Sequence, residues 1–186
     1  MMKKNLRKSV FTSCRFLFFV YFSVLIFPMN SFPKVANQKQ NMEQLSIIPK
    51  PQTIKSLEGF FRITPEIVIL CSDSSNELST ISRELADMIF THTGLQLSID
   101  IVPESEIEPH CIVLSLRSAK ESLGNEGYEL TIDPKFVTLR AFRPAGLFYG
   151  IQTFCQILSS ASSNGDQGAI SLPCMEITDY PQFPWR

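Results

Sequence analysis

The chain has 186 residues, of which 44% are hydrophobic and 19% charged, a composition that fits one globular domain with its own core. This length excludes a complete (β/α)8 barrel, which needs roughly 250 residues. The formal net charge is −1, but five of the 17 basic residues lie in the first 15 positions. Without them 12 basic residues face 18 acidic ones, a net charge of −6, which argues against a nucleic-acid partner.

A signal peptide is predicted over residues 1–31. The five cations precede an apolar run from Phe16 to Phe27, an order that is typical of export signals. The run is shorter than the about 20 residues of a comfortable membrane span, although an uncleaved N-terminal anchor is the alternative. We therefore expect an exported protein, whether periplasmic, secreted or on the cell surface, with no membrane partner beyond this segment.

A polar linker is predicted over residues 32–44, and the folded domain over residues 45–178. The domain opens with an extended segment bounded by prolines and a turn at residues 58–59. A short strand over residues 60–63 follows. The continuous apolar run at 66–70 then predicts a strand that is buried on both faces.

A helix is predicted next, and it ends near Gly94. Ser74 and Glu77 have the spacing of a capping box. Apolar residues then repeat at the spacing of one helix face, at Leu78, Ile81, Leu85 and Met88. The acidic residues of this helix fall mainly on the opposite side, which indicates a solvated face rather than a catalytic one.

Strand patterns occupy the middle of the chain. Residues 95–102 alternate between apolar and polar, as in a half-buried strand. A second apolar strand is predicted over residues 111–116. Residues 128–132 and 136–142 read as a hairpin whose turn contains Asp133 and Pro134. Successive strands of this kind favour an antiparallel or mixed sheet.

A second helix is predicted over residues 143–160, with Pro144 in its first turn and a broad apolar face. Gly146 and Gly150 lie four apart on one side of it. Because glycine costs about 1 kcal/mol in a helix interior relative to alanine, this pair indicates that another backbone or a ring packs closely there.

A surface loop over residues 159–169 is predicted to lead into one or two short strands within residues 170–181. Together these elements predict an α/β (α+β) fold. The expected architecture is a two-layer sandwich, in which a twisted, largely antiparallel or mixed sheet carries two helices on one face.

Four cysteines lie in the predicted domain, Cys71, Cys111, Cys155 and Cys174. They are widely spaced, have no C-x-x-C arrangement and could be joined only by His92 and His110, so no metal site is predicted. Their apolar neighbours indicate buried thiols. A single disulfide is the alternative in an oxidising compartment.

Few residues indicate chemistry. The sequence has no nucleophile elbow, P-loop, dinucleotide-binding or H-E-x-x-H motif. The acidic segment 103–109 is interpreted as a solvated connection. His110 and Cys111 are adjacent, but neighbours on a strand point to opposite faces, so they are not expected to form a catalytic pair.

The last residues are the exception. Arg186 follows Trp185 and Phe183, and a sugar subsite has this composition, because rings stack on a pyranose while a guanidinium donates to its hydroxyls. A surface arginine beside a core tryptophan is the alternative from composition alone.

Three segments together resemble the N-terminal domain of family 20 glycoside hydrolases, the β-N-acetylhexosaminidases: "IIPKPQTI…GFFRI", "RPAGLFYGIQTFCQIL" and "LPCMEITDYPQFPWR". The resemblance covers roughly Ser46 to Arg186. It implies a non-catalytic α/β domain that precedes a (β/α)8 barrel, with residues 179–186 as the start of the connection into that barrel. The chain alone is then expected to be inactive.

The resemblance also implies a reaction, in which terminal N-acetylhexosamine is removed from glycans with retention and with help from the substrate's own acetamido group. The family's adjacent Asp-Glu pair is absent from this sequence, so no catalytic residue is assigned. Arg186 matches the family's substrate-binding arginine. Gln182 stands where the family often has Arg. No cofactor or metal is implied.

Two alternatives stay open at this point. One is a stand-alone structural or carbohydrate-binding module, and the other is the front domain of a different glycosidase family, such as an α-glucuronidase. The oligomeric state is not predicted.

Overall fold

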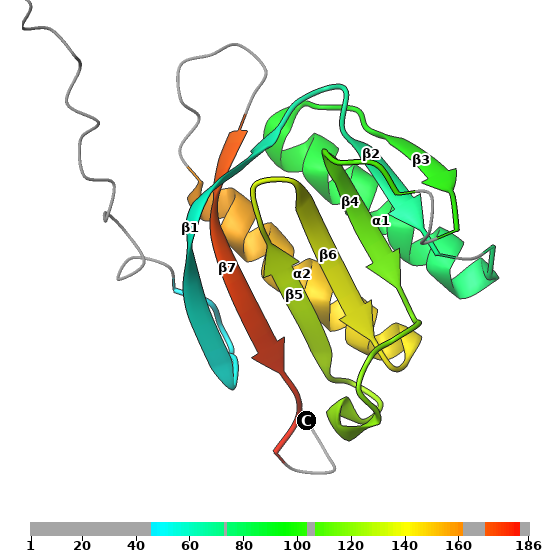
Figure 1. Cartoon of the computed structure of the whole chain (residues 1–186), viewed down its shortest axis with the longest axis vertical. Coiled ribbons are helices and arrows are strands. Elements are labelled where there is room, and N and C mark those ends of the chain that lie inside the picture. Colours follow the sequence, from blue (N-terminus) through cyan, green and yellow to red (C-terminus); the bar gives the residue numbers. More distant parts are fainter. Residues whose placement is uncertain (1–45, 73, 104–106, 162–169, 183–186) are drawn as a thin grey trace, which may run out of the picture. The chain divides into compact units, whose positions relative to one another are not determined.

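A computed structural model of the chain describes residues 46–72, 74–103, 107–161 and 170–182 (Figure 1). The predicted signal peptide and linker and residues 162–169 of the predicted loop lie outside these ranges. The strands are β1 (Thr53–Ile63), β2 (Val68–Cys71), β3 (Ser98–Ile101), β4 (Cys111–Ser115), β5 (Tyr128–Ile132), β6 (Phe136–Ala141) and β7 (Ile170–Asp179). The helices are α1 (Asn76–Thr93), α2 (Pro144–Ser160) and the single 3-10 turn η3 (Glu121–Leu123).

The described strands form one mixed sheet in the order β1-β7-β5-β6-β4-β2-β3. The half from β1 to β6 is antiparallel, whereas β6, β4, β2 and β3 pair in parallel. The parallel half follows from the connections, since α1 carries the chain from β2 back to the start of the parallel β3. The predicted mixed sheet is confirmed.

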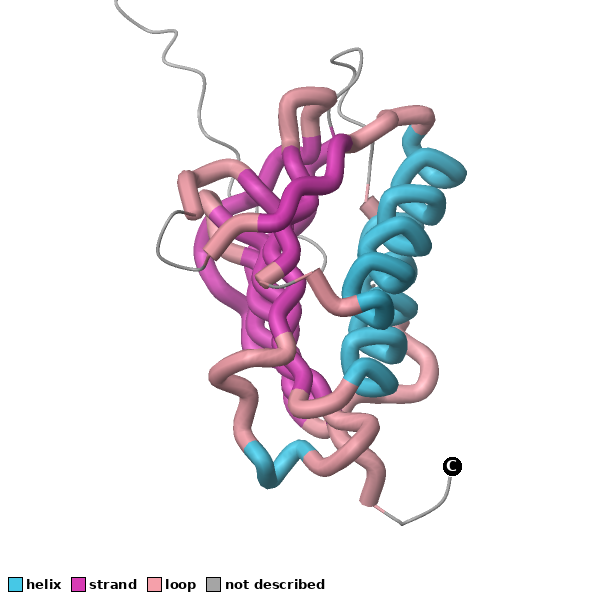
Figure 2. Tube along the Cα trace, turned by 90° about the vertical axis from the view of Figure 1, so that its right-hand side faces the viewer, coloured by secondary structure: helices cyan, strands magenta, loops and turns pink. Residues whose placement is uncertain are grey.

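Both long helices lie on the same face of the sheet, as predicted (Figure 2). The main core fills the space between the two layers. The buried residues of α1 are Leu78, Ile81, Ser82, Leu85 and Ile89. Under α2, the buried Tyr128 of β5 forms a hydrogen bond with Thr153 of this helix at 2.5 Å. No helix in the described ranges is long and apolar enough to span a membrane.

The cap of α1 differs from the prediction by one residue. Ser75, not Ser74, is the N-cap, and its hydroxyl accepts the Leu78 N–H at 3.3 Å. Because Ser74 and Ser75 are adjacent, either could be the N-cap, and the capping-box spacing from Ser74 to Glu77 favoured the wrong one. With Ser75 as the cap, the third helical position holds Leu78, so the predicted capping box does not form.

The predicted turn at residues 58–59 is wrong. β1 runs through it as one strand of 11 residues, and its register against β7 shifts between Ser56 and Phe60. Gly59 lies in this irregularity with a φ of 102°, a conformation that glycine adopts easily. The partner strand β7 is itself continuous over 10 residues, so the ladder resumes after the irregularity instead of ending.

The predicted hairpin of β5 and β6 is confirmed. Its turn is closed by Asp133, whose Oδ1 accepts the N–H groups of Lys135 at 2.7 Å and Phe136 at 3.0 Å. The alternating segment 95–102 is confirmed only in part. Its strand is limited to residues 98–101 at the sheet edge, and Ile101 is exposed there.

The glycine pair of α2 marks a close approach to the sheet. A Cβ atom on Gly146 would overlap the carbonyl oxygen of Gly127 and lie 2.8 Å from the Cβ of Ala141. The prediction of a neighbouring backbone is therefore confirmed for Gly146. At Gly150 the neighbour is the end of the Leu139 side chain, so the predicted backbone or ring is wrong there.

These neighbours predict unequal effects of adding one methyl group. Gly146→Ala should lower the free energy of unfolding by about 3 kcal/mol, because it presses on backbone that cannot move aside. Gly150→Ala should cost about 1 kcal/mol, because Leu139 can shift and alanine favours the helix. Urea denaturation of both variants measures the difference. Equal losses would contradict this account of the packing.

Candidate functional site

The predicted substrate-binding residue Arg186 lies outside the described residues, as do Trp185 and Phe183. The structure describes the chain up to Gln182. The site can therefore be built from the elements that lead toward Arg186, which are the end of β7 and the segments that contact it.

Four residues form a hydrogen-bonded group where the chain leaves β7, and we call Gln52, Asp179, Tyr180 and Gln182 the exit cluster. Asp179 ends β7 and is buried, and its Oδ1 accepts the backbone N–H of Gln52 at 3.3 Å. The side-chain amide of Gln52 donates to the carbonyl oxygen of Tyr180 at 3.4 Å. Its Oε1 accepts a hydrogen bond from Gln182 Nε2 at 3.0 Å.

The segment that enters the domain is held by a second glutamine. Gln156 of α2 accepts the N–H of Ile48 at 2.8 Å and donates to the carbonyl oxygen of the same residue at 2.9 Å. Pro51 is buried beside this segment. The entry segment is thus bound to α2 at one point and to the end of β7 at another.

The sheet face opposite the helices is polar over β5, β6 and β7. A shallow hollow of about 300 Å³ opens there, lined by Lys120, Glu129, Thr131, Thr138, Arg140, Glu176, Ile177 and Thr178. Lys120 contacts Glu129 at 2.6 Å, and Lys55 contacts Glu176 at 3.1 Å. The hydrogen bond that Lys120 donates to Glu129 raises the pKa of the exposed Lys120.

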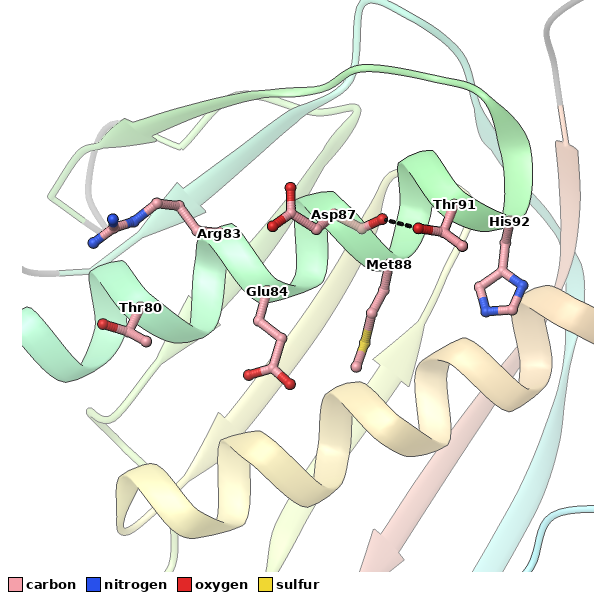
Figure 3. A pocket seen from close by; sticks show the side chains of 7 residues that line it. All are labelled: Thr80, Arg83, Glu84, Asp87, Met88, Thr91 and His92. Atoms are coloured by element: carbon pink, nitrogen blue, oxygen red, sulfur yellow. Dashed lines mark hydrogen bonds between the residues drawn. The ribbon is translucent and has the colours of Figure 1, made fainter.

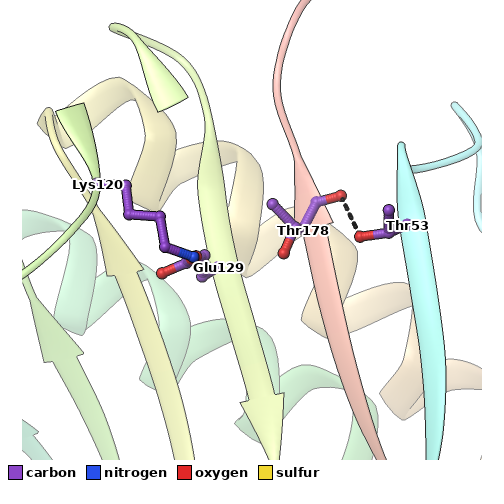
Figure 4. A network of polar contacts seen from close by, with 4 residues as sticks. All are labelled: Thr53, Lys120, Glu129 and Thr178. Atoms are coloured by element: carbon purple, nitrogen blue, oxygen red, sulfur yellow. Dashed lines mark hydrogen bonds and ion pairs between the residues drawn. The ribbon is translucent and has the colours of Figure 1, made fainter. Parts of the chain in front are cut away.

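Figure 4 shows this face from close by, with Lys120 directed at Glu129 and Thr53 beside Thr178. The Thr53 hydroxyl donates to the Thr178 carbonyl oxygen at 3.5 Å. The ion pairs on this face, Lys120–Glu129 and Lys55–Glu176, lie at the surface, and surface ion pairs contribute little to stability. The rest of the face, over β2 and β4, is apolar and includes Leu70 and Val113.

A second hollow follows α1 where this helix runs beside α2, and it is lined by Thr80, Arg83, Glu84, Asp87, Met88, Thr91 and His92 (Figure 3). All of these residues belong to one helix. Thr80, Arg83 and Thr91 donate to carbonyl oxygens of their own helix, Thr91 to that of Asp87 at 2.8 Å. Across the seam between the helices, the Cys155 thiol lies 3.2 Å from the Met88 sulfur. The predicted solvated face of this helix is confirmed.

The four described cysteines are buried thiols outside any disulfide, as the sequence predicted. Burial raises the pKa of Cys155 to about 11, with a smaller effect of the Glu84 charge. Burial and then the Asp133 charge raise the pKa of Cys174 to about 11. Burial also raises the pKa of Cys111. These groups are poor nucleophiles at neutral pH.

The predicted alternation of His110 and Cys111 along a strand does not apply, because β4 begins at Cys111 and His110 precedes it. His110 is exposed, with a φ of 69°, whereas Cys111 is buried in β4. Within the described ranges, no group of three or more His, Cys, Asp and Glu residues is placed to hold a metal ion.

Sequence reasoning did not find the exit cluster. Gln52 lies 127 to 130 positions from the three other members, and glutamines have no periodicity that would pair Gln52 with Gln182. The available signal was indirect: Gln52 and Gln182 each follow a proline, in the first and last of the three segments that resemble family 20.

Comparison with known proteins identifies the fold and its relatives. Residues 44–180 match the family described as glycosyl hydrolase family 20, domain 2. The chain belongs to this family. The resemblance inferred from the sequence is therefore confirmed, and the two-layer fold is that of a family 20 domain.

Several relatives of this family 20 domain are similar over most of the described chain. A beta-hexosaminidase of Porphyromonas gingivalis is 31% identical, over 76% of this chain and 18% of that protein. A beta-N-acetylhexosaminidase of Cellulomonas fimi is 27% identical, over 78% and 28%. The chain spans less than a third of the length of either relative.

Solved structures agree with this assignment. The family 20 beta-N-acetylhexosaminidase of Streptomyces coelicolor A3(2) superposes with a TM-score of 0.61 and 29% identity, over 75% of this chain and 27% of that one. The N-acetyl-beta-hexosaminidase of Streptomyces plicatus gives 0.60 and 27%, over 78% and 28%.

The thiols of the family 20 domain should react slowly in the native state. In a Cys14→Ser background, iodoacetamide at pH 8 should modify the four domain cysteines at least tenfold more slowly in the folded than in the unfolded chain. Mass spectrometry measures the rates. Equal rates in the two states would contradict the burial described above.

The same pKa values predict an alkaline loss of stability. Because Cys155 and Cys174 keep their protons to about pH 11 when folded, the unfolded chain loses them first, near pH 9. The free energy of unfolding should therefore fall between pH 9 and 11. Cys155→Ala should reduce the slope of this fall, as measured by denaturant titrations across that range.

Proposed function

We propose that this chain is the accessory domain of an exported β-N-acetylhexosaminidase. The match of residues 44–180 to domain 2 of family 20 carries this proposal, and the names of the relatives supply the activity. The basic and apolar N-terminal segment supports export. The substrates are glycans that end in N-acetylhexosamine.

The reaction proposed for the whole enzyme is hydrolysis with retention, assisted by the substrate. The acetamido oxygen of the terminal sugar attacks its anomeric carbon while a glutamic acid protonates the leaving oxygen, and a neighbouring aspartate orients the acetamido group. This sequence contains no adjacent Asp-Glu pair. We therefore assign the chemistry to a (β/α)8 barrel that follows the domain, and no metal or cofactor takes part.

Arg186 is the residue through which the domain would take part in substrate binding. A guanidinium presents five donors in a fixed plane, which suits the paired hydroxyls of a pyranose. Trp185 and Phe183 add rings next to it. The segment 179–186 would thus be both the connection to the barrel and part of its sugar subsite.

The 186-residue chain alone should show no turnover, because it lacks the carboxylate pair. The purified chain is incubated with an aryl N-acetyl-β-glucosaminide and the released aryl alcohol is measured. Release above the blank without enzyme would overturn the assignment of the chemistry to a following barrel.

In a form of the protein that includes the barrel, Arg186→Ala should lower kcat/KM by roughly 10- to 100-fold, as expected when hydrogen bonds from a charged donor are lost. Arg186→Lys should restore little, because an ammonium lacks the planar donors. Steady-state kinetics on the same substrate measure both variants. Wild-type kcat/KM in Arg186→Ala would show that this residue does not bind the sugar.

A further inference from the structure

We infer that the hollow on the open face of the sheet, at Arg140, is a binding site for an acidic sugar. Such a ligand carries a carboxylate or a sulfate ester among its hydroxyl groups. The site goes beyond the proposed function, because neither the hydrolysis of N-acetylhexosamine nor Arg186 is needed for it. All of its residues belong to the described part of the chain.

Strand pairing brings the polar groups of this hollow together. Arg140 of β6 lies directly opposite Glu129 of β5. Two positions earlier on β6, Thr138 lies opposite Thr131 of β5. Leu139, between Thr138 and Arg140, belongs to the core under the helices, so its two neighbours point to the opposite face. The four polar side chains therefore form two adjacent pairs on the open face of the sheet.

Arg140 differs from the other charged groups around the hollow. Glu129, directly opposite it, is bound at 2.6 Å by Lys120, which precedes η3 (Figure 4). Lys55 likewise contacts Glu176 at 3.1 Å. Both carboxylates are thus neutralised, whereas the exposed Arg140 makes no hydrogen bond or ion pair within the described ranges. The uncompensated charge of the hollow is one guanidinium, which favours an anion.

The hydroxyl groups of the hollow indicate that the anion belongs to a sugar. Thr131 and Thr138 are half-buried, and their hydroxyls have no hydrogen-bonding partner among the residues that the structure describes. Each hydroxyl can donate one hydrogen bond and accept two. Of the eight lining residues, only Ile177 lacks a polar side-chain group. A ligand rich in hydroxyl groups matches this lining, and an anionic substituent matches Arg140.

Arg140 can hold the anionic group while the sugar ring lies over the threonines. A guanidinium presents parallel N–H donors that match two oxygens of a carboxylate or a sulfate. Thr138 lies two positions from Arg140, so roughly 7 Å of strand separates the contacts to the anion from those to the hydroxyls. The hollow of about 300 Å³ is at the lower end of the volumes of small-molecule sites, which suits a single sugar unit.

The test is a titration of the 186-residue chain with small sugars, followed by ¹H–¹⁵N NMR. Glucuronic acid should bind saturably with a Kd of roughly 1–10 mM, the weak affinity of an exposed site. It should shift the amide signals of Glu129, Thr131, Thr138 and Arg140. Glucose lacks the anion and acetate lacks the hydroxyls, so each should bind at least tenfold more weakly. Glucose 6-sulfate carries a sulfate ester instead, and the tighter of the two acidic sugars identifies the anionic group.

Variants assign the binding to individual side chains. Arg140→Gln should weaken the binding of glucuronic acid at least fivefold, because it removes the charge and the paired donors. Thr138→Val should weaken it roughly two- to fivefold, as expected for one lost hydrogen bond. Arg62→Gln is the matched control, since it removes the same charge from an exposed position of β1 outside the hollow. It should leave the Kd unchanged, and circular dichroism verifies that all variants are folded.

Several results would overturn the inference. Neither acidic sugar would bind saturably if the hollow were only a solvated surface. Acetate that binds as tightly as glucuronic acid would show that the hydroxyls do not contribute, and glucose that does so would show the same for the anion. Equal losses in Arg140→Gln and Arg62→Gln would indicate a general effect of charge. None of these results bears on the hexosaminidase reaction, which the aryl glycoside assay tests independently.

Discussion

The antiparallel pairing of β7 with β1 on one side and β5 on the other is the constraint on which the rest of the domain depends. β7 carries the longest ladder of the sheet, pairing with β1 from Thr53 to Ile63. On its other side β7 pairs with β5, the first strand of the β5–β6 hairpin. The segment where the chain enters the domain and the segment where it leaves are thereby placed side by side (Figure 1). Contacts between distant glutamines and the buried Asp179 become possible only because of this pairing.

The helix layer and the sheet serve different purposes in this arrangement. α1 and α2 cover one face, and their apolar residues form the main core together with those of the strands, which stabilises the sheet (Figure 2). The glycine at 146 lets α2 lie against the backbone before β5, and the same stretch of backbone approaches Tyr180, the residue after β7. Close helix packing and the end of β7 thus meet at Gly127.

Local patterns predicted most of the elements, because periodicity and turn residues act over a few positions. The hairpin turn at Asp133, the two helices and the buried cysteines are of this kind. What failed depended on partners far away in the sequence. A glycine at 59 indicates a turn when considered alone, but β7 supplies a continuous partner and makes it an irregularity within one strand. The exit cluster joins Gln52 to residues 127 to 130 positions away, beyond the reach of periodicity and turn signals, so its hydrogen bonds became visible only in the folded chain.

A domain without a carboxylate pair can still affect the chemistry of an enzyme if it supplies one aligned group. The requirement is rigidity at the point of departure, since an arginine on an unrestrained chain would lose about 1–2 kcal/mol per residue on being ordered at a sugar. Hydrogen bonds from and to Gln52 hold Tyr180 and Gln182, the last described part of the chain, against the folded domain. The ladder between β1 and β7 makes this possible, because it places the segment before Thr53 beside the end of β7.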